Sequence, residues 1–346
     1  LGRTVLWKIS GLEAPETESA AFALGAGLWG TALFLLGWAQ ALRPGPMALL
    51  AAAVSIAAFP ALMRPRPRLM FTFGGPAGAL AGGLIAYALF HAAIMALAPP
   101  VDADALAYHL TLPKLYLAQG TTAGISWLPF SRWPHLASVL SALPLSLGLV
   151  NGPALLSWAA AAFLLSAVYC VARVELGETE AVLACAVLIV QPVIADFSGT
   201  PRIESWWALF NFLALTAAWR WRSSGDPKAL LLAGIFGGFG AAVKLMGLIV
   251  LLSMAAWSFW RQEGGFWRRA SMAALLLCAG FAVVGPWYLK CWMETGNPVW
   301  PFFPGLFGDR FGAAYIVPRF LARNQWPDDA AMTFLLQRGA VHLALP

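Results

Sequence analysis

The sequence predicts an all-α fold, a polytopic bundle of transmembrane helices, and three observations support this. Of the 346 residues, 60% are hydrophobic and only 11% are charged. A soluble globular chain carries about 25% charged residues, so this many apolar side chains need lipid as part of their solvent. The 17 Trp residues agree with this prediction, because Trp is enriched at membrane interfaces.

Apolar runs define the predicted helices, since a helix that crosses a bilayer needs about 20 predominantly apolar residues. The run at 229–259 is too long for one ordinary span and contains Lys244, so it predicts a hairpin of two short helices. The segment 135–150 is short and contains Pro144, which favours a re-entrant or surface segment. The predicted spans are 20–41, 46–63, 76–98, 153–172, 180–198, 205–221 and 270–289.

Three clusters of basic residues lie between these runs. Cytoplasmic loops carry an excess of Lys and Arg, so we expect all three clusters on the cytoplasmic side. The loops at 99–134, 199–204 and 290–330 and the turn near Lys244 then face the outer side. The clusters are Arg64, Arg66 and Arg68; Arg220, Arg222 and Lys228; and Arg261, Arg268 and Arg269.

The charge and the cysteines exclude some function classes. The net charge of +6 comes from short clusters between apolar runs, a pattern that does not indicate a nucleic-acid partner. The four Cys show neither a CxxC pair nor a metal-ligand spacing, so the sequence predicts no metal site and no disulfide framework. It does not identify a cofactor.

The loop at 99–134 carries the first candidate residues. Its spacing predicts a helix on the membrane surface, with Leu106 and Leu110 on an apolar face and Asp104 and Tyr108 on a face toward a cavity.

The polar residues of this helix have structural interpretations, and its two acids have functional ones as well. Asp102 is placed to cap the helix N-terminus, which we favour over a catalytic role. Asp104 either favours the helix dipole in the first turn or acts as a functional acid. His109, taken alone, is typical of an interfacial or hydrogen-bonded histidine.

Three further charged residues stand in or beside the other outer segments. Glu204 opens a predicted span, where an acid marks either the interface or a functional group, and Arg202 is placed to neutralise it. An unpaired ammonium inside a bilayer costs about 2.5–3.5 kcal/mol, so Lys244 is either functional or reaches the outer headgroups. Lys290 lies among aromatic residues and prolines, which form either an aromatic belt or a groove where Lys290 meets a lipid phosphate.

Three outer motifs carry a family resemblance. They are Asp104-Ala-Leu-Ala-Tyr108-His109-Leu110; Lys244-x-x-Gly247; and Pro286-Trp-Tyr-Leu-Lys290 followed by Thr295-Gly296-Asn297-Pro298-Val-Trp-Pro301-Phe. Together they resemble bacterial members of the GT-C glycosyltransferase superfamily, in particular the branch like protein mannosyltransferases and aminoarabinose transferases. The resemblance covers roughly 76–310, and Glu204 stands where relatives commonly have Asp.

The resemblance implies an activity and roles for these residues. It implies a helical bundle with juxtamembrane helices in the first outer loop and a donor sugar carried on a polyprenyl phosphate. The sugar would pass, with inversion, to an acceptor at the periplasmic face of a bacterial inner membrane. Asp104 would be the general base, and Lys244 and Lys290 would offset charge on the donor phosphate. The other implied substrate-binding residues are Asp102, Tyr108, His109 and Glu204.

The resemblance and the apolar runs together divide the chain into three predicted regions. These are 1–75 with two extra transmembrane helices, 76–310 as the GT-C-like core, and 311–346 as an outer loop with the start of a further helix. The chain begins at Leu1 and stops inside an apolar run, so we expect it to be part of a longer protein.

Three hypotheses about function follow. The first is the polyprenyl-phosphate-dependent glycosyltransferase, with the donor and membrane lipids as partners. The second is a non-catalytic GT-C-like scaffold, with other subunits of a larger membrane complex as partners. The third, a transporter, is disfavoured because the sequence shows no inverted repeat and its charges gather outside the midplane.

Overall fold

The fold is helical throughout the part of the chain that the structure describes. This computed structural model describes residues 2–3, 5–6, 17–62 and 75–308, and no β-strand occurs within these ranges. The α-helices are α2 (Thr17–Trp38), α3 (Pro44–Leu62), α4 (Gly75–Leu97), α5 (Thr111–Gln119), α6 (Leu136–Leu140), α7 (Ala142–Ser146), α8 (Gly152–Glu175), α9 (Glu178–Ile189), α10 (Pro192–Phe197), α11 (Glu204–Ser224), α12 (Pro227–Val243), α13 (Gly247–Arg261), α14 (Phe266–Thr295) and α15 (Pro304–Phe307). A π-helix, η1 (Ala105–His109), and a 3₁₀-helix, η2 (Pro129–Arg132), complete the elements.

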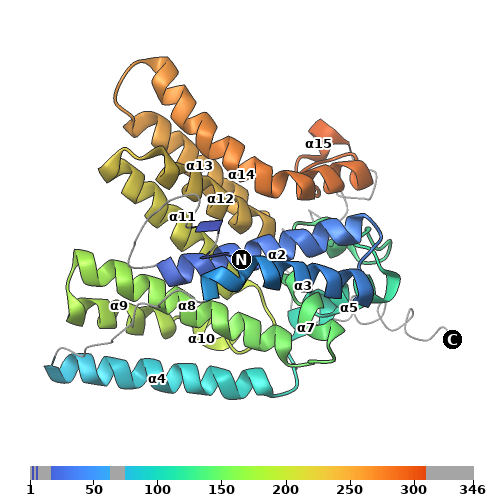
Figure 1. The fold of residues 1–346 in the computed structure, drawn as a ribbon, viewed down its shortest axis with the longest axis horizontal. Helices are drawn as coiled ribbons and strands as arrows, with labels where there is room; N and C mark the ends of the chain where they lie inside the picture. Colours follow the sequence, from blue (N-terminus) through green and yellow to red (C-terminus); the bar gives the residue numbers. More distant parts are fainter. Residues whose placement is uncertain (1, 4, 7–16, 63–74, 309–346) are drawn as a thin grey trace, which may run out of the picture. The chain divides into compact units, whose positions relative to one another are not determined.

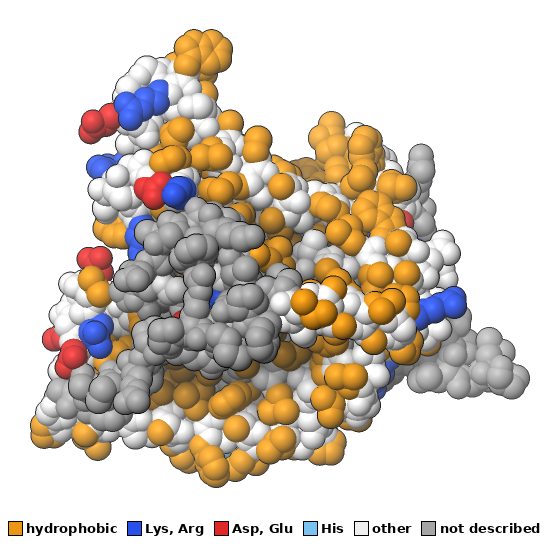
Figure 2. Space-filling model, viewed as in Figure 1, with side chains coloured by type: hydrophobic (Ala, Val, Ile, Leu, Met, Phe, Trp, Pro, Cys, Tyr) orange, Lys and Arg blue, Asp and Glu red, His pale blue; other side chains and the backbone are white. Residues whose placement is uncertain are grey.

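Four of these helices are long and apolar enough to cross a membrane: α2, α4, α8 and α14. The apolar side chains also cover much of the visible surface, as Figure 2 shows in orange. A soluble protein would bury such side chains, and a membrane protein exposes them to lipid. The predicted all-α, multi-span membrane fold is therefore confirmed.

The chain divides into two compact units, Leu1–Trp287 and Tyr288–Pro346. The N-terminal helix α2 belongs to the first unit through ring contacts. Phe22 stacks on Phe163 of α8 at 4.1 Å and lies 5.5 Å from the ring of Trp206 in α11. The predicted domain boundaries after residues 75 and 310 stay predictions.

The predicted hairpin at 229–259 is confirmed. Helix α12 ends at Val243 and α13 begins at Gly247, with Lys244 in the turn between them. The turn is tight because Gly247 lies against the preceding helix: a Cβ on Gly247 would lie 2.4 Å from the carbonyl oxygen of Gly240. Only glycine leaves room for this approach.

Gly247→Ala is therefore expected to lower the free energy of unfolding by about 1–3 kcal/mol, the usual cost of adding a methyl group to a filled site. The atoms that it would meet are backbone atoms, which cannot rotate away. The midpoint of thermal unfolding in detergent measures this change. Gly83→Ala in α4 is the matched control, because its Cβ would meet nothing within 4 Å. Equal losses in both variants would contradict the tight turn.

The segment 135–198 differs in part from the prediction. The short segment at 135–150 forms α6 and α7, and two helices of five residues are far too short to cross the hydrocarbon core. The continuous helix predicted at 180–198 is wrong, because α9 ends at Ile189 and α10 begins at Pro192. Proline lacks an N–H and forces the preceding Gln191 into an extended conformation (φ −64°, ψ 131°), which interrupts the helix.

The charged connections gather at one end of the first unit. Figure 1 places the α8–α9, α11–α12 and α13–α14 connections on the left, and Figure 2 shows charged side chains along the same edge. Two of the three basic clusters belong to these connections, as the sequence predicts. The third cluster, Arg64, Arg66 and Arg68, lies outside the described residues.

Candidate functional site

A single arginine, Arg202, forms ion pairs with three carboxylates from two segments that are distant in the sequence. Arg202 precedes α11, and its Nη1 donates to Asp102 Oδ2 at 3.0 Å while its Nη2 donates to Asp104 Oδ2 at 2.7 Å. Its Nε lies 3.5 Å from Glu204 Oε2. The Arg202 guanidinium also packs on an aromatic ring, with its central carbon 3.7 Å from the centre of the Phe197 ring. The predicted outer loops at 99–134 and 199–204 therefore lie on the same side of the first unit.

The surroundings of Arg202 fix both its backbone position and the charge of its side chain. Ser157 of α8 donates a hydrogen bond to the Arg202 carbonyl oxygen at 2.8 Å. Burial works to lower the pKa of Arg202, but the charges of Glu204, Asp102 and Asp104 outweigh it and raise that pKa. The guanidinium is thus a permanent cation, and the predicted pairing with Glu204 is confirmed.

Asp102 caps the first turn that follows it. Its Oδ1 accepts a hydrogen bond from the Ala105 backbone N–H at 2.8 Å, which satisfies a donor that the helix start leaves unpaired. The predicted capping role of Asp102 is confirmed. Its second oxygen binds Arg202, so the same carboxylate joins the helix start to the loop before α11.

Asp104 is the most accessible carboxylate of the group. Its side chain is 48% exposed, against 21% for Asp102 and 15% for Glu204. Only its Oδ2 has a hydrogen-bond partner among the described residues, and that partner is Arg202. Asp104 therefore offers one carboxylate oxygen to a molecule that approaches from outside.

The helix after Asp104 contains a π-turn, which the sequence spacing did not predict. The Leu110 N–H donates to the Ala105 carbonyl at 2.8 Å, five residues back instead of four. The extra residue per turn rotates the side chains that follow it. Leu106 is 48% exposed while Leu110 is 3% exposed, so the predicted shared apolar face of these two residues is wrong.

Tyr108 and His109 lie beside the carboxylates in the π-turn. Tyr108 stacks on Phe130 with ring centres 4.4 Å apart. Burial, Asp104 and Glu204 raise the pKa of the Tyr108 hydroxyl, so Tyr108 stays protonated and can donate a hydrogen bond. His109 is buried, and its Nδ1 lies 2.9 Å from Ser138 Oγ of α6.

The second ring nitrogen of His109 has no partner among the described residues. Burial, together with the positive charge of Arg202, lowers the pKa of His109 to about 3. The folded protein therefore binds a proton at His109 less tightly than the unfolded chain does. The free energy of unfolding is unaffected by this difference above the ordinary histidine pKa of about 6.5, and it decreases as the pH falls below that value.

His109→Asn is therefore expected to reduce the acid sensitivity of the protein. When the pH is lowered from about 7 to about 5.5, the wild type loses about 1 kcal/mol of unfolding free energy, because His109 stays neutral in the folded protein and is protonated in the unfolded chain. Asn at this position does not titrate, so the variant does not have this loss. Asn also retains a polar group for Ser138. Thermal unfolding in detergent at the two pH values measures the effect. The control variant is His91→Asn, which replaces an exposed histidine outside the candidate site. An equal change in both variants would contradict the role of His109.

Lys244 joins the group from the hairpin turn. Its side chain is exposed, and its Nζ lies 5.8 Å from the centre of the Trp207 ring in α11. Its charge also acts to lower the pKa of His109. A cation over an aromatic face is weakly held and remains able to meet an anion. The turn at Lys244 therefore lies on the same side as Arg202 and Asp104, as the sequence predicts.

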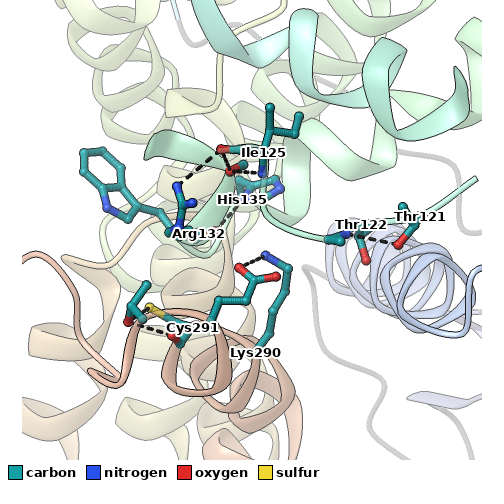
Figure 3. Close-up of polar contacts among 12 residues, drawn as sticks. Thr121, Thr122, Ile125, Arg132, His135, Lys290 and Cys291 are labelled. Carbon is teal, nitrogen blue, oxygen red and sulfur yellow. Dashed lines mark hydrogen bonds and ion pairs between the residues drawn. The ribbon is translucent and has the colours of Figure 1, made fainter. Parts of the chain in front are cut away.

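Lys290 belongs to the second unit, where it has a nearby acidic partner. Its Nζ lies 2.9 Å from Glu294 Oε2, and only 3% of its side chain is exposed (Figure 3). The motif after it ends helix α14: Gly296 has a positive φ of 78°, and the Asn297 side chain donates to the Phe302 carbonyl at 2.8 Å. The predicted phosphate-binding role of Lys290 stays a prediction.

Figure 3 also shows the loop that leads into α6. Arg132 Nη1 donates to the Ile125 carbonyl at 3.3 Å, and Ser131 Oγ accepts from the Ile125 N–H at 2.8 Å. These bonds fold 125–132 into a fixed loop. This loop positions Phe130 under Tyr108 and leads into the short helix that carries Ser138.

A comparison with known families bears on this group of residues. Residues 134–289 match the family model for dolichyl-phosphate-mannose-protein mannosyltransferase. This match confirms the predicted resemblance to the GT-C superfamily. It supports a membrane glycosyltransferase of the GT-C type. Neither the curated proteins nor the solved structures contain a match to this chain.

The matched segment covers only part of the candidate site. Arg202, Glu204 and Lys244 lie inside it. The segment from Asp102 to His109 comes before it, and Lys290 comes directly after it. The contacts to Arg202 nevertheless connect Asp102 and Asp104 to the matched part.

Proposed function

We propose that this protein is an enzyme that transfers a sugar from a polyprenyl-phosphate donor to an acceptor at the periplasmic face of a bacterial inner membrane. The observation that supports this best is the half-exposed carboxylate of Asp104, which is oriented by Arg202 and shares its surroundings with the exposed cation of Lys244. A base for the acceptor and a cation for the donor phosphate are the two groups that this reaction needs.

Asp104 is the general base of the proposed reaction. The Arg202 guanidinium donates to Asp104 Oδ2 and thereby fixes the position of this carboxylate. The other oxygen, Oδ1, has no hydrogen-bond partner among the described residues and accepts the proton of the acceptor hydroxyl. An ionised carboxylate near neutral pH is a weak base, and its contribution comes from its position against the acceptor.

The transfer itself is a single displacement. Asp104 takes the proton while the acceptor oxygen forms a bond to the anomeric carbon of the sugar. The bond between that carbon and the phosphate oxygen breaks, and its electron pair leaves with the polyprenyl phosphate. The configuration at the anomeric carbon inverts, because the acceptor attacks opposite the leaving group. Lys244 offsets the negative charge that grows on the leaving phosphate.

The remaining residues of the group either contact the substrates or hold the site together. Tyr108 is protonated and donates a hydrogen bond to a sugar hydroxyl. Asp102 and Glu204 share Arg202 with Asp104 and hold the loop and the helix start together. His109 lies next to Tyr108 and lines the site, and its buried Nε2 has no partner among the described residues.

The experiment that tests this function is a transfer assay. The full chain, purified in mild detergent, is incubated with radiolabelled polyprenyl-phosphate sugars and with extracted periplasmic acceptors. The expected result is release of free polyprenyl phosphate together with a labelled acceptor. If no donor is turned over, and the protein instead co-purifies in fixed ratio with a membrane complex, the scaffold hypothesis is correct and the transferase is not.

Lys244→Met is expected to raise the donor KM about fivefold to tenfold, since one charge-assisted contact to the phosphate is lost. Methionine keeps the length and the apolar stem of the side chain. Lys228→Met is the matched control, because Lys228 is equally exposed but lies at the opposite end of α12, about 24 Å away along the helix. An unchanged KM in Lys244→Met would remove Lys244 from the donor site.

A further inference from the structure

The first unit contains an apolar cavity between α8, α11 and α13. Its volume is about 830 Å³, which lies within the range of about 300–1,000 Å³ for small-molecule sites in proteins. Val171 of α8, Phe212 of α11 and Met254 of α13 are among the apolar residues that line it. Polar groups lose their hydrogen bonds to water in such surroundings, so the cavity suits a hydrocarbon chain and not a sugar or a peptide.

The cavity is open to lipid along two helices. Leu215 and Trp219 of α11 line it and are 52% and 59% exposed. Ile249 and Ser253 of α13 also line it and are exposed. A hydrocarbon chain can therefore enter the cavity from the bilayer without the unfolding of a helix.

One end of the cavity lies close to Lys244. Ile249 is in the first turn of α13, directly after the connection that carries Lys244. Met246, in that connection, continues the face of α13 that lines the cavity, since Ile249 and Ser253 follow it at the helical spacings i+3 and i+7. The side chain of Met246 is 48% exposed. An exposed apolar path thus leads from Lys244 into the cavity.

The other end of the cavity lies deeper than one leaflet of a bilayer. Lys244 Nζ lies 5.8 Å from the centre of the Trp207 ring in α11, so Trp207 marks the level of Lys244. Along α11, Phe212 is about 8 Å and Arg220 about 20 Å farther from the outer side than Trp207 is. Half of the hydrocarbon core is only about 15 Å thick. The acyl chain of an outer-leaflet phospholipid would therefore fill only the near part of the cavity.

We propose that this cavity binds the polyprenyl chain of the donor and makes the protein selective for long chains. The inference rests on the proposed function for its ligand, because it takes the donor phosphate to lie at Lys244. From there the chain passes Met246 and runs through the cavity toward Trp257. A long chain fills the whole cavity, whereas a short chain held at Lys244 leaves the deep part empty. Each methylene group that is buried contributes about fourfold to affinity, so the deep part favours long chains.

Native mass spectrometry of the full chain tests this proposal without a transfer reaction. The protein is purified in mild detergent and offered equal amounts of undecaprenyl phosphate, geranyl phosphate and phosphatidylglycerol. The wild type is expected to retain one undecaprenyl phosphate in preference to the other two lipids. The geranyl chain is the short-chain probe, because it carries the same phosphate but cannot fill the cavity.

Variants that fill the cavity test its role directly. Ser253→Trp should reduce the retention of undecaprenyl phosphate at least about tenfold, since the loss of two buried methylene groups is sufficient for this. Thr216→Trp adds the same ring from the α11 wall and should have the same effect, which keeps the test decisive if one variant folds poorly. Ala256→Trp is the matched control, because Ala256 is an exposed residue of α13 outside the cavity lining. Thermal unfolding in detergent checks each variant.

The outcomes separate the chain site from the proposed reaction. Equal retention of the long and short chains by the wild type, or equal losses in Ser253→Trp and Ala256→Trp, would overturn the chain site even if the protein transfers a sugar. A phosphatidylglycerol that undecaprenyl phosphate does not displace, and that Ser253→Trp removes, would assign the cavity to a phospholipid and overturn the proposal as well. If undecaprenyl phosphate binds as expected but no sugar is transferred, the proposed reaction fails and the chain site stands.

Discussion

Asp104→Asn is expected to lower the rate of sugar transfer by about 10²- to 10⁴-fold, the range that general bases contribute. Asparagine has the same shape as aspartate, and its side-chain oxygen can still accept the hydrogen bond from Arg202 Nη2. It cannot take a proton from the acceptor hydroxyl. The variant therefore removes the basic group and leaves the surrounding contacts largely in place.

The assay needs a control for the loss of a charge. Asp226→Asn is suitable, because Asp226 caps α12 through the Lys228 N–H at 2.9 Å, and asparagine caps helices as well as aspartate does. It should transfer sugar at the wild-type rate. Thermal unfolding of both variants in detergent checks that the fold is intact. Full activity in Asp104→Asn would rule out Asp104 as the base.

Much of the fold could be predicted from the sequence because membrane helices depend on local composition. The helices at 17–38, 75–97, 152–175 and 266–295 lie within a few residues of the predicted spans. Lipid removes the need to know which face of a helix is buried, so the number of consecutive apolar residues is sufficient. The break at Pro192 was missed because an apolar run of this length has the composition of one span. Only the proline marked the interruption.

The π-turn at Ala105–His109 was beyond a prediction based on ordinary helix spacing. That spacing assumes bonds from residue i to i+4, and one extra residue in the turn changes which side chains share a face. The π-turn is tied to the contacts of Asp102 and His109, since Asp102 caps its start and Ser138 binds the ring at its end. Ser138 lies 29 residues after His109, so no local pattern in the sequence indicates this contact.

The candidate site was predicted residue by residue, but its connections were not. The sequence marks Asp102, Asp104 and Glu204 as acids at helix starts and places Arg202 as a partner for Glu204 alone. The pairs from Arg202 to Asp102 and Asp104 join positions about 100 residues apart. Local sequence patterns do not indicate contacts between residues that are so far apart in the chain. The contacts of Ser138 and Trp207 were missed for the same reason, because a lone serine or tryptophan is common in membrane helices.

Arg202→Gln is expected to lower the free energy of unfolding by about 3 kcal/mol, near the lower limit for breaking a buried ion pair. The Arg202 side chain is 14% exposed, and it neutralises three carboxylates that would otherwise repel one another. The half-exposed Asp104 contributes less than the other two, because solvent screens its charge. Glutamine retains hydrogen-bonding capacity, so the loss reports mainly on the charge. Thermal unfolding in detergent measures it, and the exposed Arg173→Gln is the control.

A rescue experiment separates this electrostatic role from simple packing. If the carboxylates repel one another in Arg202→Gln, then adding Asp102→Asn and Glu204→Gln should restore most of the lost stability, because no charge is left unpaired except the half-exposed Asp104. Both replacements keep the size of the side chain, and asparagine keeps the cap at residue 102. The rescued protein should nevertheless remain slow in sugar transfer, since Asp104 has lost the group that orients it. Recovery of stability without recovery of transfer would show that Arg202 both holds the two loops together and positions the base. No recovery of stability would mean that the packing of Arg202 on Phe197 matters more than its charge.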